Sequence, residues 1–233
     1  MNKVGVLGWI GRGFAVLLAL ILLWNIWMVL HIVAWRWVHP SNTAFMSVQL
    51  DRLQASNPAA ELKHEWVDYE QISPNLKRAL VASEDAKFLD HEGFDWEGMQ
   101  TAWEKNIKKG RIVAGGSTIT QQLAKNLFLS GSKNPLRKLE EAFLTVMIEL
   151  ILDKQRIFEI YLNVIEWGDG VFGAQAAAEH YYKTSAKKLS VAQSAKLASM
   201  VTNPRYYDKN RSDRRLLRKA AIIQRRMPYA DIP

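Results

Sequence analysis

The sequence contains no cysteine, which excludes disulfide bonds and every site that depends on a thiolate, whether as metal ligand or as nucleophile. Acidic residues are also scarce, with 23 against 31 lysines and arginines, and the formal net charge is +8. This imbalance favours an anionic partner: nucleic acid, a phospholipid surface or a phosphorylated substrate. Internal repeats are absent, and strict alternation of apolar and polar residues is weak, so we expect a mainly α fold with a short hairpin or none.

Prolines are few, seven in 233 residues, and several coincide with capping side chains at predicted helix boundaries. The boundary signals are Ser73-Pro74, Asn134-Pro135, Asp153 with Gly168, and the capping box of Ser190 and Gln193 followed by Pro204. They predict helices over about 73–85, 135–152, 154–167 and 190–203, and the basic amphipathic segment 211–227 predicts another. Residues 142–152 are apolar almost all the way round, so we expect this helix to run through the core.

One long hydrophobic run lies near the N-terminus. Residues 14–30 are apolar apart from Asn25, and the run continues to Trp35. Its length is roughly the 20 residues that a helix needs to cross a bilayer. The alternative is a cleaved signal peptide, but the apolar core of such a peptide has only about 7–15 residues and ends at a small-residue cleavage site. We therefore expect an uncleaved transmembrane anchor over residues 13–35.

The charges around this run predict an orientation and a domain order. Lys3 and Arg12 precede the run, which places residues 1–12 in the cytoplasm, although Arg36 on the other side weakens the asymmetry. Residues 36–66 are then expected to form a connector, and residues 67–233 a domain outside the bacterial inner membrane, in the periplasm. Nucleic acid is disfavoured as a partner in that location, and bilayer lipids are favoured.

Two predicted helices carry carboxylates at unusual places. Glu84 follows Leu76 and Leu80 at four-residue spacing, so it continues an apolar stripe. On the next helix, Arg137 and Glu141 are also four residues apart, at the start of an apolar segment. The alternative interpretation is an exposed Glu84 and an ordinary surface ion pair worth a few tenths of a kcal/mol.

Between these helices lies the segment GGSTITQQLAKN, residues 115–126, in which hydroxyls, amides and a lysine surround only two large aliphatic side chains. Core segments and solvated loops rarely have this composition. Because glycosidic chemistry uses one or two carboxylates beside an oxocarbenium-like centre, this combination suggests a sugar-processing site.

Five segments in order resemble the conserved blocks of the peptidoglycan glycosyltransferases, the family shared with the N-terminal domains of class A penicillin-binding proteins. The segments are SEDAKFLDHEGFD (83–95), GGSTITQQLAKN (115–126), RKLEE (137–141), KQRIFEIYLNVIEWG (154–168) and GAQAAAEHYY (173–182). The resemblance covers about residues 67–205. Since the chain ends where a bifunctional member continues into a penicillin-binding domain, it resembles the monofunctional type.

The resemblance implies a lysozyme-like helical lobe and a smaller, membrane-facing jaw lobe, with a cleft between them. It also implies a reaction that polymerises lipid II, a disaccharide-pentapeptide on undecaprenyl diphosphate. The 4-hydroxyl of the incoming lipid II attacks the anomeric carbon of the growing, lipid-linked glycan, inverts that centre and expels undecaprenyl diphosphate. Other cell-wall synthesis or division proteins are further candidate partners.

Carried over by motif position, Glu84 resembles the general base that deprotonates the acceptor hydroxyl. Lys125 and Arg137 are expected to stabilise the departing diphosphate, and Lys138 is a further candidate for this role. Glu141 resembles the family's second essential glutamate, and three roles are open: it could orient the cations, bind a divalent cation such as Mg²⁺ or Mn²⁺, or assist at the donor. Orientation is favoured, and no cofactor is expected to be required.

Further residues of these blocks are expected to contact substrate or shape the cleft. Those expected to bind sugar or diphosphate oxygens are Ser117, Thr118, Gln121 and Gln122. Those expected to shape the cleft are Asp85, Phe88 and His91. For His91 a structural hydrogen bond is favoured over proton transfer.

Two basic segments have open interpretations. Residues 96–114 mix tryptophans with lysines and fit either an interfacial membrane segment or a packed helix with a basic face. Thr101 stands where some relatives carry a phosphate-facing arginine, for which Lys105 or Arg111 could substitute. The C-terminal segment 211–227 fits either packing on the core or contact with anionic headgroups.

Two other functions compete with polymerisation. A lysozyme-like hydrolase would share the helical lobe and a catalytic glutamate, but it has no need for cations aimed at a diphosphate. A catalytically inactive, membrane-anchored scaffold for cell-wall proteins would not depend on Glu84.

Overall fold

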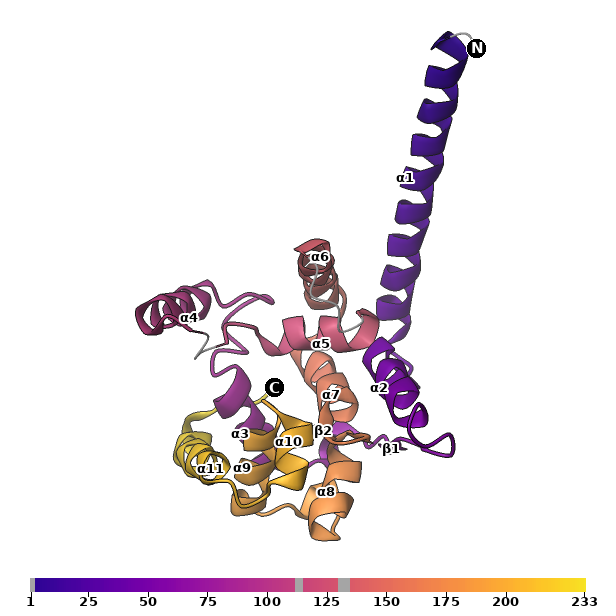
Figure 1. The fold of residues 1–233 in the computed structure, drawn as a ribbon. Helices are drawn as coiled ribbons and strands as arrows, with labels where there is room; N and C mark the ends of the chain where they lie inside the picture. The colour runs from indigo at the N-terminus through magenta and orange to yellow at the C-terminus, as the bar shows by residue number, and fades with distance from the viewer. Residues whose placement is uncertain (1–2, 112–114, 130–134) are drawn as a thin grey trace.

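The computed structural model describes residues 3–111, 115–129 and 135–233, and it confirms a mainly α fold with one N-terminal apolar helix (Figure 1). Helix α1 (Lys3–Ala34) contains a stretch of 24 residues, Gly11–Ala34, with a mean hydropathy of 2.5 and a largely exposed surface. Its length and composition suffice to cross a membrane. The C-terminal end of α1 is attached to the rest of the fold, since Met28 and Ile32 are buried and Trp35 packs against Phe128.

The lower lobe in Figure 1 holds most of the core. Its helices are α3 (Pro74–Glu84), α7 (Lys154–Val164), α8 (Ala174–Tyr182), α9 (Val191–Met200), α10 (Pro204–Lys209) and α11 (Arg214–Arg226), with 3-10 turns η1 (Tyr69–Gln71), η2 (Ala186–Lys188) and η3 (Met227–Tyr229). Its largest fully buried side chains include Phe88, Phe158, Tyr161 and Trp167. Helix α9 packs against both α3 and α11, which joins the C-terminal helix to the one that carries Glu84.

Several predicted helix caps are confirmed. Ser73 caps α3 through a bond from the Asn75 amide, Asp153 caps α7, and the predicted capping box of Ser190 precedes α9. Asn134 lies outside the described residues. The predicted C-terminal helix is also confirmed as α11, which packs on the core through Leu216 and Ile223.

The predicted end of α7 was wrong. The helix ends at Val164, and strand β2 (Glu166–Gly168) follows where more helix was expected. Strand β2 pairs antiparallel with β3 (Val171–Phe172), and β1 (Lys63–His64) pairs parallel with the other edge of β3. Gly173, with φ of +81° and the Asn163 carbonyl close by, lets the chain turn from β3 into α8.

The segment expected as a connector is folded. It contains helix α2 (Ala44–Gln54), capped by Thr43, and strand β1. Helix α2 packs against α5, and β1 completes the small sheet. This segment therefore links the apolar helix to the site-bearing helices by direct packing.

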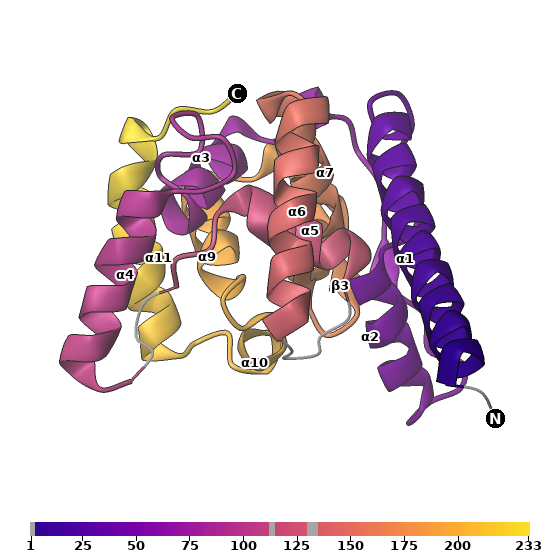
Figure 2. The ribbon, with the colours of Figure 1, turned by 90° about the horizontal axis from the view of Figure 1, so that it is seen from above.

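Helices α4 (Trp96–Lys109), α5 (Ile119–Phe128) and α6 (Pro135–Ile151) form the smaller upper lobe, on the side from which α1 projects. Figure 2 looks down on this side and shows α4, α6 and α1 spread across it. The expectation that α6 runs through the core was wrong, because Leu139 and Leu150 are 69% and 71% exposed. Only one face of α6, with Leu144 and Ile148, is buried.

Candidate functional site

Glu84 is the last residue of α3, and its side chain is only 10% exposed. Three groups surround its carboxylate. Ser83 Oγ donates to Oε1 at 2.9 Å, Gln122 Nε2 donates to Oε2 at 3.2 Å, and the Lys219 ammonium lies 3.5 Å from Oε1. Leu80 and Leu76, one and two turns earlier, are fully buried, as the apolar stripe predicts. These three neighbours therefore fix the Glu84 carboxylate at the edge of the core, and the alternative interpretation of an exposed Glu84 is wrong.

A second hydrogen bond fixes the orientation of Gln122. Tyr161 on α7 donates its hydroxyl to Gln122 Oε1 at 3.1 Å, which leaves the amide nitrogen to face Glu84. Burial raises the pKa of Tyr161 well above its usual value, and the charges of Glu84 and Asp85 add to this shift. The phenol therefore stays protonated and remains a donor. Two successive hydrogen bonds therefore link Tyr161 in the core, through Gln122, to the Glu84 carboxylate.

Asp85 joins two of the sequence blocks. Its carboxylate accepts from the Ile119 amide, the first residue of α5, at 3.0 Å, and from His91 Nε2 at 3.0 Å. The Asp85 side chain is 2% exposed. Because a carboxylate at a helix N-terminus satisfies a free amide and interacts favourably with the helix dipole, Asp85 positions α5 beside Glu84.

The loop before α5 is held by Thr118. Its side chain caps α5 together with Gln121, and its hydroxyl donates to the Gly93 carbonyl at 2.7 Å. Ser117 is exposed, whereas Thr118 and Gln121 are buried. Of these three side chains, Ser117 is the one that is free to meet a ligand.

Glu141 forms ion pairs with two cations in the first half of α6. Arg137 Nη1 donates to one carboxylate oxygen at 3.1 Å, and Lys138 Nζ binds the other oxygen. The Glu141 side chain is 4% exposed, so this is a buried anion with two cations and not a surface pair. Among the described residues, no three His, Asp or Glu side chains converge as a metal site.

Lys125 links this cluster electrostatically to the Glu84 region. Its side chain is exposed, yet protein packs around the ammonium group, and this burial lowers the pKa of Lys125. The charges of Arg137 and Lys138 lower this pKa further, while the carboxylates of Glu141 and Glu84 oppose the shift. Lys125 therefore lies within electrostatic range of both glutamates.

Two cavities border this arrangement. The Glu84 cavity, of about 450 Å³, lies between α3, α4 and the loop before α5. The polar side chains that line it include Glu84, Thr101, Lys105, Ser117 and Arg226. The Glu166 cavity, of about 240 Å³, lies on the side of Gln122 and Lys125 and is also lined by Glu166, Asn203 and Arg205. Arg111 lines neither cavity.

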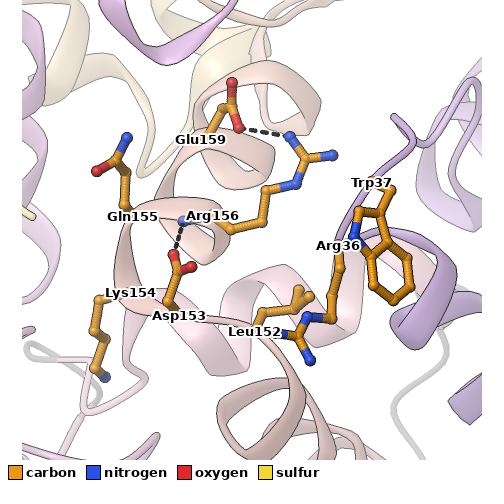
Figure 3. A pocket seen from close by; sticks show the side chains of 8 residues that line it. All are labelled: Arg36, Trp37, Leu152, Asp153, Lys154, Gln155, Arg156 and Glu159. Atoms are coloured by element: carbon orange, nitrogen blue, oxygen red, sulfur yellow. Dashed lines mark hydrogen bonds and ion pairs between the residues drawn. The ribbon is translucent and has the colours of Figure 1, made fainter.

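A third cavity, of about 630 Å³, is larger but contains none of these residues (Figure 3). It lies where the chain leaves α1 and where α7 begins, between Trp37 and Lys154. Arg156 donates to the carbonyls of Trp35 and Val38 at 2.7 and 2.6 Å, which ties the end of α1 to α7. This cavity lies where the apolar helix meets the domain and contains none of the candidate residues. The candidate site is therefore the region around Glu84.

Comparison with known proteins agrees with this geometry. The sequence model of a family described as "Transglycosylase" matches residues 51–228. This chain belongs to the transglycosylase family. A "Biosynthetic peptidoglycan transglycosylase" of Laribacter hongkongensis is 68% identical over 97% of this chain and 100% of the relative. Proteins of the same description from Chromobacterium violaceum and Methylobacillus flagellatus are 64% and 61% identical, over 94% and 95% of this chain and 96% and 97% of the relatives.

In this transglycosylase, some residues expected to touch substrate are instead internal supports. Phe88 has no exposed surface and packs on Phe158, so it belongs to the core. Gln121 is committed to the helix cap. Buried and already bonded side chains have little surface to offer a ligand, so the expected contacts of Phe88 and Gln121 in the cleft are corrected. The structural hydrogen bond favoured for His91 is confirmed by its bond to Asp85.

The sequence reasoning missed two basic residues of α11. Lys219 pairs with Glu84, and Arg226 lines the Glu84 cavity. The basic amphipathic pattern of 211–227 was the available signal, but it pointed to headgroups or core packing. The contact depends on how α11 packs on α3, which periodicity does not reveal. Tyr161 and Glu166 lie inside recognised blocks and were also missed.

Proposed function

We propose that this chain polymerises lipid II into linear glycan strands, with inversion at the anomeric carbon and undecaprenyl diphosphate as the leaving group. Family membership and the names of the relatives support peptidoglycan glycan synthesis. The substrates and the roles below are inferred from the site.

The observation that carries this proposal is the position of Glu84 between two groups of cations. Arg226 and Lys105 line the Glu84 cavity, and Lys219 pairs with the Glu84 carboxylate itself. On the other side lies Lys125, whose pKa is lowered by the nearby charges of Arg137 and Lys138. A polymerase needs this arrangement because donor and acceptor are both lipid-linked diphosphates, whereas a hydrolase of finished glycan meets neither diphosphate.

The acceptor binds on the Glu84 cavity side. Arg226 and Lys105, which line this cavity, hold its diphosphate, and Glu84 removes the proton from its 4-hydroxyl. A positioned general base contributes typically about 10²–10⁴-fold to such a step. Ser117 and the backbone at Gly115 and Gly116 line the same cavity and offer further hydrogen bonds to the substrates.

The donor binds on the side of Lys125. As the acceptor oxygen forms its bond to the anomeric carbon, the bond from that carbon to the diphosphate oxygen breaks, and its electron pair leaves with undecaprenyl diphosphate. Lys125 and Arg137 stabilise this growing negative charge, and Lys138 supports them from the same cluster. The acceptor proton ends on Glu84.

Glu141 orients these cations. It is buried and accepts from Arg137 and Lys138 with separate oxygens. Without it, Arg137 and Lys138 would repel each other and Lys125, and their positions would not be fixed.

The upper lobe faces the bilayer. Leu136, Leu139 and Leu150 on α6 are each about 70% exposed, and so are Trp96 and Trp103 on α4. These helices lie on the side of the molecule from which α1 projects (Figures 1 and 2). Exposed apolar patches of this kind mark membrane contact, which explains why α6 is apolar nearly all round without being a core helix. With α1 as a single-pass anchor of the inner membrane, the N-terminus is cytoplasmic and the domain periplasmic.

Labelled lipid II tests this function directly. The full-length protein in detergent is expected to convert lipid II into ladders of glycan polymer on a gel. Release of soluble fragments from purified cell wall, without polymer formation, would support a hydrolase instead. Absence of both activities in a folded protein would support a scaffold.

A further inference from the structure

Arg36 is the cation that weakens the charge asymmetry around the apolar helix. It follows the apolar stretch Gly11–Ala34 after one further residue, and its side chain is exposed. Its guanidinium carbon lies 5.5 Å from the ring centre of Trp37, which is 73% exposed. Within the described ranges of the chain, Arg36 pairs with no carboxylate. A free cation at this end of α1 is not explained by the orientation of the helix, so it calls for another role.

Arg36 and Trp37 line the cavity of about 630 Å³ drawn in Figure 3. Both residues come from the end of α1, and Asp153 comes from the residue before α7. The volume falls within the roughly 300–1,000 Å³ typical of small-molecule sites. Because the cavity borders the end of the apolar stretch, it lies at the level of the lipid headgroups, where tryptophan and arginine side chains are common.

Most charges that line this cavity are neutralised by neighbouring side chains. Arg156 donates to Glu159 at 2.5 Å, and its other donors are bonded to the end of α1. Lys154 pairs with Glu149 at 2.8 Å and also donates to the His91 carbonyl at 2.6 Å. These groups therefore have little charge left to offer a ligand.

Two charged groups of the cavity remain open, Arg36 and Asp153. One oxygen of Asp153 accepts from the Arg156 amide at 2.8 Å and so caps α7. Its second oxygen has no hydrogen-bond partner among residues 3–111, 115–129 and 135–233. The cavity thus offers one free cation and one carboxylate with a free oxygen.

One open cation and one open anion fit a zwitterion better than an anion. A guanidinium binds a phosphate group through two parallel hydrogen bonds, and a carboxylate accepts strongly from an ammonium group. Phosphoethanolamine carries both of these ligand groups. A headgroup with a phosphate alone would gain Arg36 but would bring its negative charge close to Asp153.

We propose that this cavity binds the headgroup of a phosphatidylethanolamine lipid from the leaflet next to the domain, with the phosphate on Arg36 and the ammonium on Asp153. The exposed Trp37 ring packs against the glycerol region of the same lipid. The bound lipid joins the end of α1 to the start of α7, in addition to the hydrogen bonds of Arg156. Binding requires α1 to lie in a bilayer, but it depends neither on the direction of α1 nor on the proposed polymerisation.

Native mass spectrometry of the full-length protein in detergent tests this site with three phospholipids that share their acyl chains. Phosphatidylethanolamine is the proposed ligand. Phosphatidylcholine has the same charges, but its methylated nitrogen has no N–H to donate to Asp153, and phosphatidylglycerol has the phosphate without an ammonium. We expect phosphatidylethanolamine to bind about tenfold more tightly than the other two, which is roughly the effect of one charge-assisted hydrogen bond.

Two substitutions separate the two halves of the headgroup. Asp153→Asn removes the charge but keeps a side chain that caps helices equally well, so the fold is expected to persist. It is expected to lower the affinity for phosphatidylethanolamine to that for phosphatidylglycerol, without weakening phosphatidylglycerol. Arg36→Gln is expected to weaken both lipids about tenfold, because both carry the phosphate.

The matched control is Arg12→Gln. Arg12 lies near the other end of α1, with its guanidinium carbon 5.7 Å from the ring of Trp9, but it lines no part of this cavity. Its replacement is expected to leave all three affinities unchanged. Because each preference is a ratio measured within one preparation, a partly unfolded fraction does not alter it.

Equal affinities of the three lipids for the wild type would overturn the inference, since the cavity would then be an unspecific interfacial contact. Tighter binding of phosphatidylglycerol than of phosphatidylethanolamine would indicate a site for anionic lipids and would overturn it as well. A preference for phosphatidylethanolamine that survives Asp153→Asn, or an effect of Arg36→Gln no larger than that of Arg12→Gln, would have the same consequence.

Discussion

Lys219 of the C-terminal helix places its ammonium group 3.5 Å from Oε1 of Glu84. The contact joins helices α3 and α11, which are far apart in the sequence, at the carboxylate proposed as the base. The ammonium group orients the Glu84 carboxylate, and it adds a positive charge next to a residue that lines the cavity assigned to the acceptor. Both effects make Lys219 important for the reaction.

Replacement of Lys219 tests this contact. Lys219→Ala is expected to lower kcat/KM for lipid II about tenfold or more, because it removes a charge beside both base and acceptor. The matched control is Arg218→Ala, which removes the same charge from an exposed neighbouring position on α11. Equal kcat/KM values for the two variants would contradict the assignment.

Replacement of Glu141 tests whether it orients cations or binds a metal. Glu141→Gln is expected to reduce polymerisation more than tenfold, because Arg137 and Lys138 lose their buried counter-charge. Added Mg²⁺ or Mn²⁺ is expected to restore none of this activity. Glu140→Gln is the control with the same change in net charge, and it keeps a side-chain oxygen that accepts from Trp24. Recovery of the Glu141 variant with a divalent cation would favour the metal role.

Asp85 is expected to act mainly on stability. Asp85→Asn weakens the bonds from the Ile119 amide and from His91, and each buried group left unsatisfied costs about 1–3 kcal/mol. For a chain of this size, thermal unfolding is then expected about 2–4 °C earlier per kcal/mol lost. The exposed Asp90→Asn provides the control. A melting temperature equal to that of Asp90→Asn would refute the role of Asp85 in positioning α5.

The raised pKa of Glu166 predicts a pH dependence of stability. Between the usual value of 4.5 and about 7, the folded protein keeps a proton that the unfolded chain has released, so this residue's contribution to stability falls as pH rises through that window. The loss is on the order of 3 kcal/mol at most. Glu166→Gln lacks this term, so its melting temperature relative to wild type is expected to be higher at pH 8 than at pH 5. A pH-independent difference would contradict the shift.

Local signals in the sequence correctly predicted several helix boundaries around the site and the position of Glu84 at the edge of the core. Ser73, Asp153 and Ser190 cap helices where expected, because a cap depends on a few adjacent residues. The spacing of Leu76, Leu80 and Glu84 likewise placed Glu84 at the edge of the core.

Other features depended on information that the pattern does not contain. The apolar helix α6 was taken for a core helix, since periodicity does not show whether an apolar side chain is buried or exposed. Strand β2 was taken for the end of α7, because the short run that includes Ile165 and Trp167 is compatible with either structure. Lys219, Arg226 and Glu166 join the site through tertiary packing, which no local spacing encodes.

The central claim is that Glu84 accepts the proton of the attacking hydroxyl, and the most direct test is the turnover of labelled lipid II by Glu84→Gln. The account predicts at least a 100-fold loss of polymer formation, in line with the roughly 10²–10⁴-fold contribution of general bases, with an unchanged melting temperature. Glu97→Gln, which alters an exposed carboxylate of the same cavity, is expected to keep nearly full activity. Polymer formation by Glu84→Gln at the rate of the Glu97 variant would contradict the account.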